Sequence, residues 1–312
     1  MDSSGHSPGH GHGHGHVTAT GRHKGALTGT LVIALVTFAA QAIGAAVSGS
    51  LALLADAGHV LADSGGVALA LLATILAARP PTGRRTFGWA RAEILAAAVN
   101  GLVLAGIGVY VLVEGIRRLI EPSPVEPGGM ALFALIGLVG NLVGVALLFR
   151  AREASLNMRG AFLEVVTDTL TSVGVLIAAA VIATSGFLRA DALVSVVIGL
   201  VILPRAVKLL GEAVNILLES APEGVDLDEI RRHIREVDHV RDVHDLHVHT
   251  VTSGLPVLTA HIVVDTECFS DGHAPRILDE LQHCLAGHFD VEHSTLQVEP
   301  AGHIEHEHPT HI

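Results

Sequence analysis

The chain has 312 residues, of which 50% are hydrophobic and only 16% are charged. With a mean hydropathy of +0.53, this composition excludes an ordinary soluble protein and indicates one embedded in a lipid bilayer. The formal net charge is −12 at pH 7, so we expect no nucleic acid partner. The two cysteines are too few for a disulfide framework and suit a reducing compartment.

The two ends of the chain are rich in histidine. Residues 1–24 form an N-terminal segment in which glycine and histidine alternate from His10 to His16. Residues 301–312 form a C-terminal tail that is also rich in histidine. Both segments offer almost nothing to bury, so we expect them to be disordered. The N-terminal segment would hold divalent cations weakly, although its pattern is also that of a purification tag. It has no apolar core, so we expect no cleavable signal peptide.

Six segments between these ends are apolar enough to cross a membrane, which takes about 20 residues for ~30 Å of hydrocarbon. They lie in a predicted membrane domain, residues 25–218: Leu27 to Val47, Leu51 to Ala78, Trp89 to Leu119, Met130 to Phe149, Arg159 to Ser185 and Ala190 to Leu218.

Arginines gather in the connections after the second and fourth segments. The positive-inside rule therefore places these connections, and both termini, in the cytoplasm of a multi-pass protein of the cell membrane. Three of these arginines, Arg84, Arg85 and Arg91, would also be able to pair with acidic residues and tie the membrane part to the soluble part.

Residues 219–300 are predicted to form a small soluble domain of order αββαβ. The elements are a helix from Asp226 to Val237, strands from Val243 to Val251 and Val257 to Val264, a helix from Ala274 to Leu285 and a strand from Thr295 to Val298. This order suits a two-layer, ferredoxin-like α+β module. The predicted fold class is therefore a six-helix membrane protein followed by a small α+β cytoplasmic domain.

Two pairs of ionisable residues lie inside the apolar segments. His59 is the single histidine between residues 25 and 232, Asp63 follows it by four residues, and Glu164 and Asp168 repeat this spacing. Residues i and i+4 share one face of a helix. Ionisable groups in lipid are costly unless they pair or bind an ion, and four ligands suit a tetrahedral divalent cation. Three carboxylates without metal would take up protons, which predicts metal–proton antiport.

Other functions remain open for intramembrane polar residues. They would also suit an interhelical network without an ion, a passive metal channel or a membrane metal sensor. An enzyme is not expected, because the His-Glu-x-x-His signature of a metalloprotease is absent. Asp56 would face an access path or cap its helix. The other single polar residues are expected to join helices: Gln41, Asn100, Glu114 and Asn141.

The motifs around these residues resemble the cation diffusion facilitator family. They are SLALLADAGHVLAD at residues 50–63, FGWARAEIL at 87–95, RGAF at 159–162, NILLE at 215–219 and TSG at 252–254. The resemblance extends from about Leu27 to Glu299. It implies a homodimer of six-helix subunits, each exporting zinc or a similar divalent metal against protons through a site between the second and fifth segments, without an organic cofactor.

One position departs from the family pattern. Zinc-transporting members usually have a histidine where this chain has Glu164. An oxygen ligand in place of a nitrogen makes the ligand set of the transport site chemically harder. The site would then accept cobalt, manganese, iron or cadmium beside zinc. Zinc remains the first expectation.

The soluble domain carries further candidate ligands. The resemblance assigns metal binding and dimer bracing to His244, His261, His273 and Glu299, with zinc as a structural or regulatory ligand. From the strand pattern alone, His247 and His249 share a face, whereas His244 lies at the strand's start or on the opposite face. His247 and His249 are accessory candidates, although relatives often have tryptophan at the position of His249.

Overall fold

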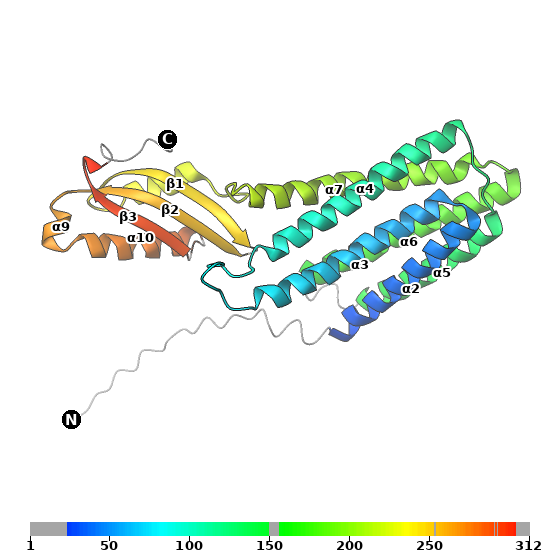
Figure 1. Ribbon diagram of the computed structural model, residues 1–312, viewed down its shortest axis with the longest axis horizontal. Helices are drawn as coiled ribbons and strands as arrows, with labels where there is room; N and C mark the ends of the chain where they lie inside the picture. The colour runs from blue at the N-terminus through cyan, green and yellow to red at the C-terminus, as the bar shows by residue number, and fades with distance from the viewer. Residues whose placement is uncertain (1–23, 150–155, 253, 290, 292, 304–312) are drawn as a thin grey trace, which may run out of the picture. The chain divides into compact units, whose positions relative to one another are not determined.

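The computed structural model describes residues 24–149, 156–252, 254–289, 291 and 293–303 (Figure 1). The histidine run from His10 to His16 and residues 304–312 of the predicted tail lie outside the described residues. The chain divides into two compact units, one of Met1–Ser64 and Leu104–Leu203 and the other of Gly65–Val103 and Pro204–Ile312.

Among the described residues, six helices are long and apolar enough to cross a membrane, which confirms the six predicted spans. They are α2 (Lys24–Ser48), α3 (Leu51–Ala77), α4 (Ala92–Ile120), α5 (Pro127–Phe149), α6 (Leu156–Ser185) and α7 (Arg189–Leu217).

The ends of these helices follow local chemistry. Helix α4 begins at Ala92 rather than at Trp89, because Gly88 has a φ of +62° and the residues around it form turns. The guanidinium of Arg85 lies 3.6 Å from the centroid of the Trp89 ring and covers this turn. Helix α5 begins at a proline, whose missing N–H is no loss in the first turn of a helix.

In the first unit, α2 packs along α5, and α5 packs along α6. Gly44 permits the close approach of α2 to α5, since a Cβ atom there would lie 2.4 Å from the Cβ of Phe133. Large apolar side chains elsewhere on these helices, such as Val36, Leu132 and Leu170, are more than half exposed. Such a surface suits lipid and would be a liability in water.

The soluble domain belongs to the second unit and has two layers. Its elements are α8 (Leu227–Arg235), β1 (Val240–Thr252), β2 (Leu255–Val264), α9 (Cys268–Asp271), α10 (Ala274–Phe289) and β3 (His293–Pro300). The sheet order is β1-β2-β3, with β1 antiparallel and β3 parallel to β2. Figure 1 shows α10 along one face of these strands.

The core of this domain lies between the helices and the sheet. It includes Ile230 and Ile234 of α8, Leu258 of β2, and Leu281 and Leu285 of α10. Asp226 caps α8, because its side chain accepts hydrogen bonds from the backbone N–H groups of residues 228 and 229. The predicted α+β order is confirmed, and the short helix α9 is an addition to it.

Strand β1 contains an irregularity that decides where its histidines lie. His244 pairs with His261 and His247 pairs with Thr259, so β1 has one more residue than β2 in this stretch. The extra residue is accommodated by Asp245, whose φ is +49°. As a result, Val243 and Leu246 both face the core, and His244 lies with His247 on the other face.

The connection between α3 and α4 contacts the soluble part within the second unit. Arg91 Nη2 lies 2.6 Å from Glu219 Oε1, and Thr252 Oγ1 donates to Glu93 Oε2 at 2.9 Å. The hydrogen bond from Arg91 holds the pKa of Glu219 below its ordinary value. One of the predicted arginine–acid pairs is thus present, although an exposed pair of this kind contributes only about 0–1 kcal/mol.

Candidate metal centre

Three of the four predicted transport-site residues come together in the first unit. His59 and Asp63 lie one turn apart on α3, and Asp168 lies on α6. His59 Nε2 is 3.5 Å from Asp63 Oδ2 and 3.4 Å from Asp168 Oδ1. One ligand atom from each residue lies within 4.8 Å of the other two. The i,i+4 spacing therefore places an imidazole and a carboxylate together against the same neighbouring helix.

The distances between these atoms suit a shared cation. Two ligands bound to zinc at ~2.0–2.1 Å in tetrahedral geometry lie ~3.3 Å apart. The separations of 3.4 and 3.5 Å are close to that value. His59 and Asp168 are also buried, so the two carboxylates would offset the charge of a divalent ion in a medium of low dielectric.

Glu164 lies outside this group of ligand atoms. It is half-buried on α6, one turn before Asp168. Residues four apart share one face of a helix. A fourth ligand from Glu164 stays a prediction.

Asp56 lies on α3 in a hydrogen-bond network of its own. Its carboxylate accepts from Gln41 Nε2 of α2, from Thr171 Oγ1 at 2.8 Å and from Ser172 Oγ at 3.2 Å, the last two on α6. Asn141 of α5 donates to the same Ser172 oxygen at 3.2 Å. Gln41 and Asn141 therefore join helices as predicted. Asp56 lies inside α3 and does not cap it; it links α3 to α2 and α6.

The start of α3 is held by Asp191, a residue that the sequence did not single out. Asp191 is buried in the first turn of α7 and accepts from Ser50 Oγ at 2.5 Å, Leu51 N at 2.8 Å and Ala52 N at 3.1 Å. These two N–H groups belong to the first turn of α3, which has no partners for them within the helix. The sequence signal that could have identified it is an aspartate at the start of the apolar span from Ala190 to Leu218. Asp191 thus positions the helix that carries His59.

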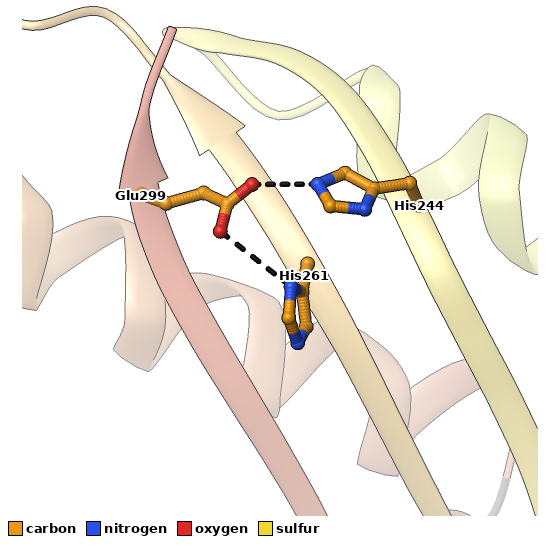
Figure 2. Close-up of side chains that lie close together, drawn as sticks. All are labelled: His244, His261 and Glu299. Carbon is orange, nitrogen blue, oxygen red and sulfur yellow. Dashed lines mark hydrogen bonds and ion pairs between the residues drawn. The ribbon is translucent and has the colours of Figure 1, made fainter. Parts of the chain in front are cut away.

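The α+β domain holds a second group of ligand atoms. Figure 2 shows His244 of β1, His261 of β2 and Glu299 of β3 directed toward one another. His244 Nε2 lies 2.6 Å from Glu299 Oε1, and His261 Nδ1 lies 3.5 Å from Glu299 Oε2. One ligand atom from each lies within 4.8 Å of the others, and the Glu299 side chain is only 2% exposed. A buried carboxylate facing two imidazoles is able to bind a metal ion.

The other predicted ligands of this domain lie apart from that group. His273 Nδ1 is 2.8 Å from Asp271 Oδ2, and its ring stacks on His239 with centroids 5.1 Å apart. The hydrogen bonds from His273 hold the pKa of Asp271 below its ordinary value. His247 Nε2 lies 2.9 Å from Asp245 Oδ1, and His249 lies opposite Val257 in the sheet.

Two family models match the chain. The model of the cation efflux transmembrane domain matches residues 27–218, and that of the cation efflux protein cytoplasmic domain matches residues 222–301. Together they include both groups of ligand atoms described above.

The matches to three similar proteins cover most of each of those proteins and most of this chain. The metal cation efflux system protein CzcD of Cupriavidus metallidurans is 42% identical over 276 residues, 88% of this chain and 84% of CzcD. The zinc transporter ZitB of Escherichia coli is 43% identical over 261 residues, 83% and 82% of the two chains. A Bacillus subtilis protein named as a cadmium, cobalt and zinc/H(+)-K(+) antiporter is 37% identical over 279 residues, 89% and 87%. Because these matches extend through both the helices and the cytoplasmic domain, the chain belongs to the cation efflux family of membrane transporters, the cation diffusion facilitators.

Proposed function

We propose that the protein exports divalent metal cations, zinc first, from the cytoplasm in exchange for protons. One observation carries the proposal: the ligand atoms of His59, Asp63 and Asp168 lie within 4.8 Å of one another on helices apolar enough to span a membrane. Such a group of ionisable residues in lipid is expected to bind an ion.

The same group supplies a reason for proton exchange. Without metal, two carboxylates close together at low dielectric repel each other, and protonation removes that repulsion. A bound divalent cation removes it as well, so metal and protons compete for the same oxygens. A site that opens alternately to the two sides would then let inward proton flow drive outward metal movement.

The names of relatives support both the substrate range and the coupling. ZitB is a zinc transporter, and the Bacillus subtilis relative is named as a cadmium, cobalt and zinc antiporter with H(+) among its coupling ions. If Glu164 contributes an oxygen, the harder ligand set would extend the range toward cobalt, manganese or iron. A passive channel would conduct the same metals without counterflow, and a sensor would bind them without flux.

We also infer the setting in which the site works. The arginines of the cytoplasmic connections favour a cell-membrane protein with both termini in the cytoplasm. The match to the family's cytoplasmic domain supports a homodimer. His244, His261 and Glu299 would hold a second, structural or regulatory metal in that domain, with His273, His247 and His249 as further candidates.

The test is flux into proteoliposomes that carry a zinc indicator and a pH indicator. Zinc movement accompanied by proton movement in the opposite direction, repeated with cobalt, cadmium and manganese, is the expected result. Zinc movement with no response of the pH indicator would indicate a channel. Zinc binding without movement would indicate a sensor.

The substitution Glu164→His should sharpen the preference for zinc. It replaces a hard oxygen near the site with the nitrogen that zinc-transporting relatives usually carry, and nitrogen ligands favour zinc over manganese. We expect manganese and cobalt to compete less well against zinc flux in this variant, by roughly tenfold for one changed ligand. Thr167→Val, one residue before Asp168, serves as the control. An unchanged competition profile would remove Glu164 from the site.

A further inference from the structure

The connection between α3 and α4 carries four arginines, and one of them pairs with a carboxylate of the protein. That one is Arg91, which contacts Glu219. The other three, Arg79, Arg84 and Arg85, are exposed, and among the described residues no ion pair joins them to a carboxylate. Three positive charges at the end of two membrane-spanning helices are thus available to a partner of opposite charge.

The backbone of this connection brings Arg79 and Arg85 close together. Thr82 N donates to Arg85 O at 3.0 Å and Arg85 N donates to Thr82 O at 2.9 Å, which closes a tight turn with Arg84 at its tip. Gly88 N donates to Arg85 O at 2.9 Å, and a Cβ atom on Gly88 would lie 3.4 Å from Arg79 O. The backbone of Gly88 therefore lies against that of both arginines. A group of charges that is already assembled loses little entropy when a ligand binds.

Trp89 supports one of these arginines. The guanidinium carbon of Arg85 lies 3.6 Å from the centroid of the Trp89 ring. A guanidinium stacked on an aromatic face keeps its N–H groups at its edges, where they are able to form paired hydrogen bonds with phosphate oxygens. Tryptophan itself is enriched at the membrane–water interface, at the level of the lipid headgroups.

The lengths of the two helices place the connection at that level. Helix α3 has 27 residues and α4 has 29, and both are apolar enough to span a membrane. At ~1.5 Å per residue each is about 40 Å long, which is close to the ~40–45 Å of a bilayer with its headgroups. Arg79 follows the last residue of α3 by two positions, and Trp89 precedes the first residue of α4 by three. Both therefore lie at the depth of the lipid phosphates.

We propose that Arg79, Arg84 and Arg85, with Trp89 beneath Arg85, bind the headgroup of an anionic phospholipid. A zwitterionic lipid also has a phosphate, but its ammonium group would be repelled by three arginines. A lipid is favoured over free phosphate because the bilayer holds its phosphates at this depth at all times. The proposal requires only that α3 and α4 span the membrane, and it is independent of the ion that the protein carries.

The site makes a claim that the positive-inside rule does not. That rule counts the charges of a connection and predicts its side of the membrane. A binding site also prefers one class of headgroup at one place on the protein. Each arginine near an anionic surface contributes an attraction that corresponds to about a fivefold change in affinity.

The experiment uses Trp89 as its probe, because it is the single tryptophan of the chain. The full-length protein is reconstituted in phosphatidylcholine, which is replaced stepwise by phosphatidylglycerol brominated near the glycerol end of its acyl chains. Bromine quenches tryptophan fluorescence on contact, and phosphatidylcholine brominated at the same carbons gives the baseline. We expect quenching at a lower mole fraction of the anionic lipid. Arg79→Gln and Arg84→Gln should each reduce this preference about fivefold.

Arg159→Gln is the matched control. It removes the same charge from an exposed position at the start of another membrane span and should leave the preference unchanged. Arg85 stays in place because it contacts the fluorophore. Equal quenching by the two lipids in the wild type would overturn the proposal, as would an equal loss in Arg159→Gln. Loss of the preference in millimolar inorganic phosphate would identify a soluble phosphate as the ligand and overturn the assignment to lipid.

Discussion

Replacing Asp168 by asparagine is expected to abolish metal transport while leaving the protein folded. The amide has the size of the carboxylate but no charge, so a divalent ion beside His59 and Asp63 would keep one uncompensated positive charge in the membrane. A charge in that position costs about 3 kcal/mol, which corresponds to a loss of at least about 10²-fold in affinity. Zinc-driven fluorescence and proton counterflow in proteoliposomes should disappear together.

Thr167→Val is the matched control for this experiment. Thr167 is the neighbour of Asp168 on α6, and its hydroxyl donates at 3.0 Å to the backbone oxygen of Leu163 on the same helix. Valine keeps the shape and removes only this local bond, so flux should stay close to that of the wild type. Zinc flux of normal size in Asp168→Asn would mean that the ion passes elsewhere, and the proposed transport site would be wrong.

The membrane helices could be predicted because their signal is one of length and composition. Each apolar run is long enough to span a bilayer, and lipid leaves helices as the way to satisfy the backbone. The proximity of His59 to Asp63 could also be predicted, because residues four apart lie on the same face of a helix. The meeting of α3 with α6 is different in kind. It depends on packing between segments about a hundred residues apart in the chain, so the sequence indicated it only through the chemistry of the two ionisable pairs and through the family resemblance.

The details that escaped prediction depend on geometry that single residues do not encode. The position of His244 was left open because a strand pattern of period two cannot foresee the extra residue at Asp245. His273 was placed with the sheet ligands, but a residue before α10 is directed by its local turn, and Asp271 holds it there. Asp191 was missed because its partners lie on another helix.

The second large effect is expected at Asp191, on stability rather than on binding. Asp191→Ala would leave Ser50 Oγ and the N–H groups of Leu51 and Ala52 without their buried acceptor. A lost cap and unsatisfied buried donors together should destabilise the protein by about 3 kcal/mol. For a chain of this size that corresponds to a fall of roughly 5–10 °C in the midpoint of thermal unfolding, which can be followed by tryptophan fluorescence or by loss of the folded species in detergent.

Two further variants separate loss of the cap from loss of a polar side chain at a helix end. Asp191→Asn keeps one side-chain acceptor for the N–H groups of α3 and should recover part of the loss. Thr184→Val removes a hydroxyl that bonds only to carbonyls of its own helix, at 2.8 and 3.4 Å, and should be close to neutral. If Asp191→Ala unfolds at the wild-type temperature, α3 does not depend on this carboxylate for its start. If it is destabilised as expected, the positions of His59 and Asp63 depend on hydrogen bonds made about two and three turns before them, because a helix that begins in a fixed place carries its ligands to a fixed place.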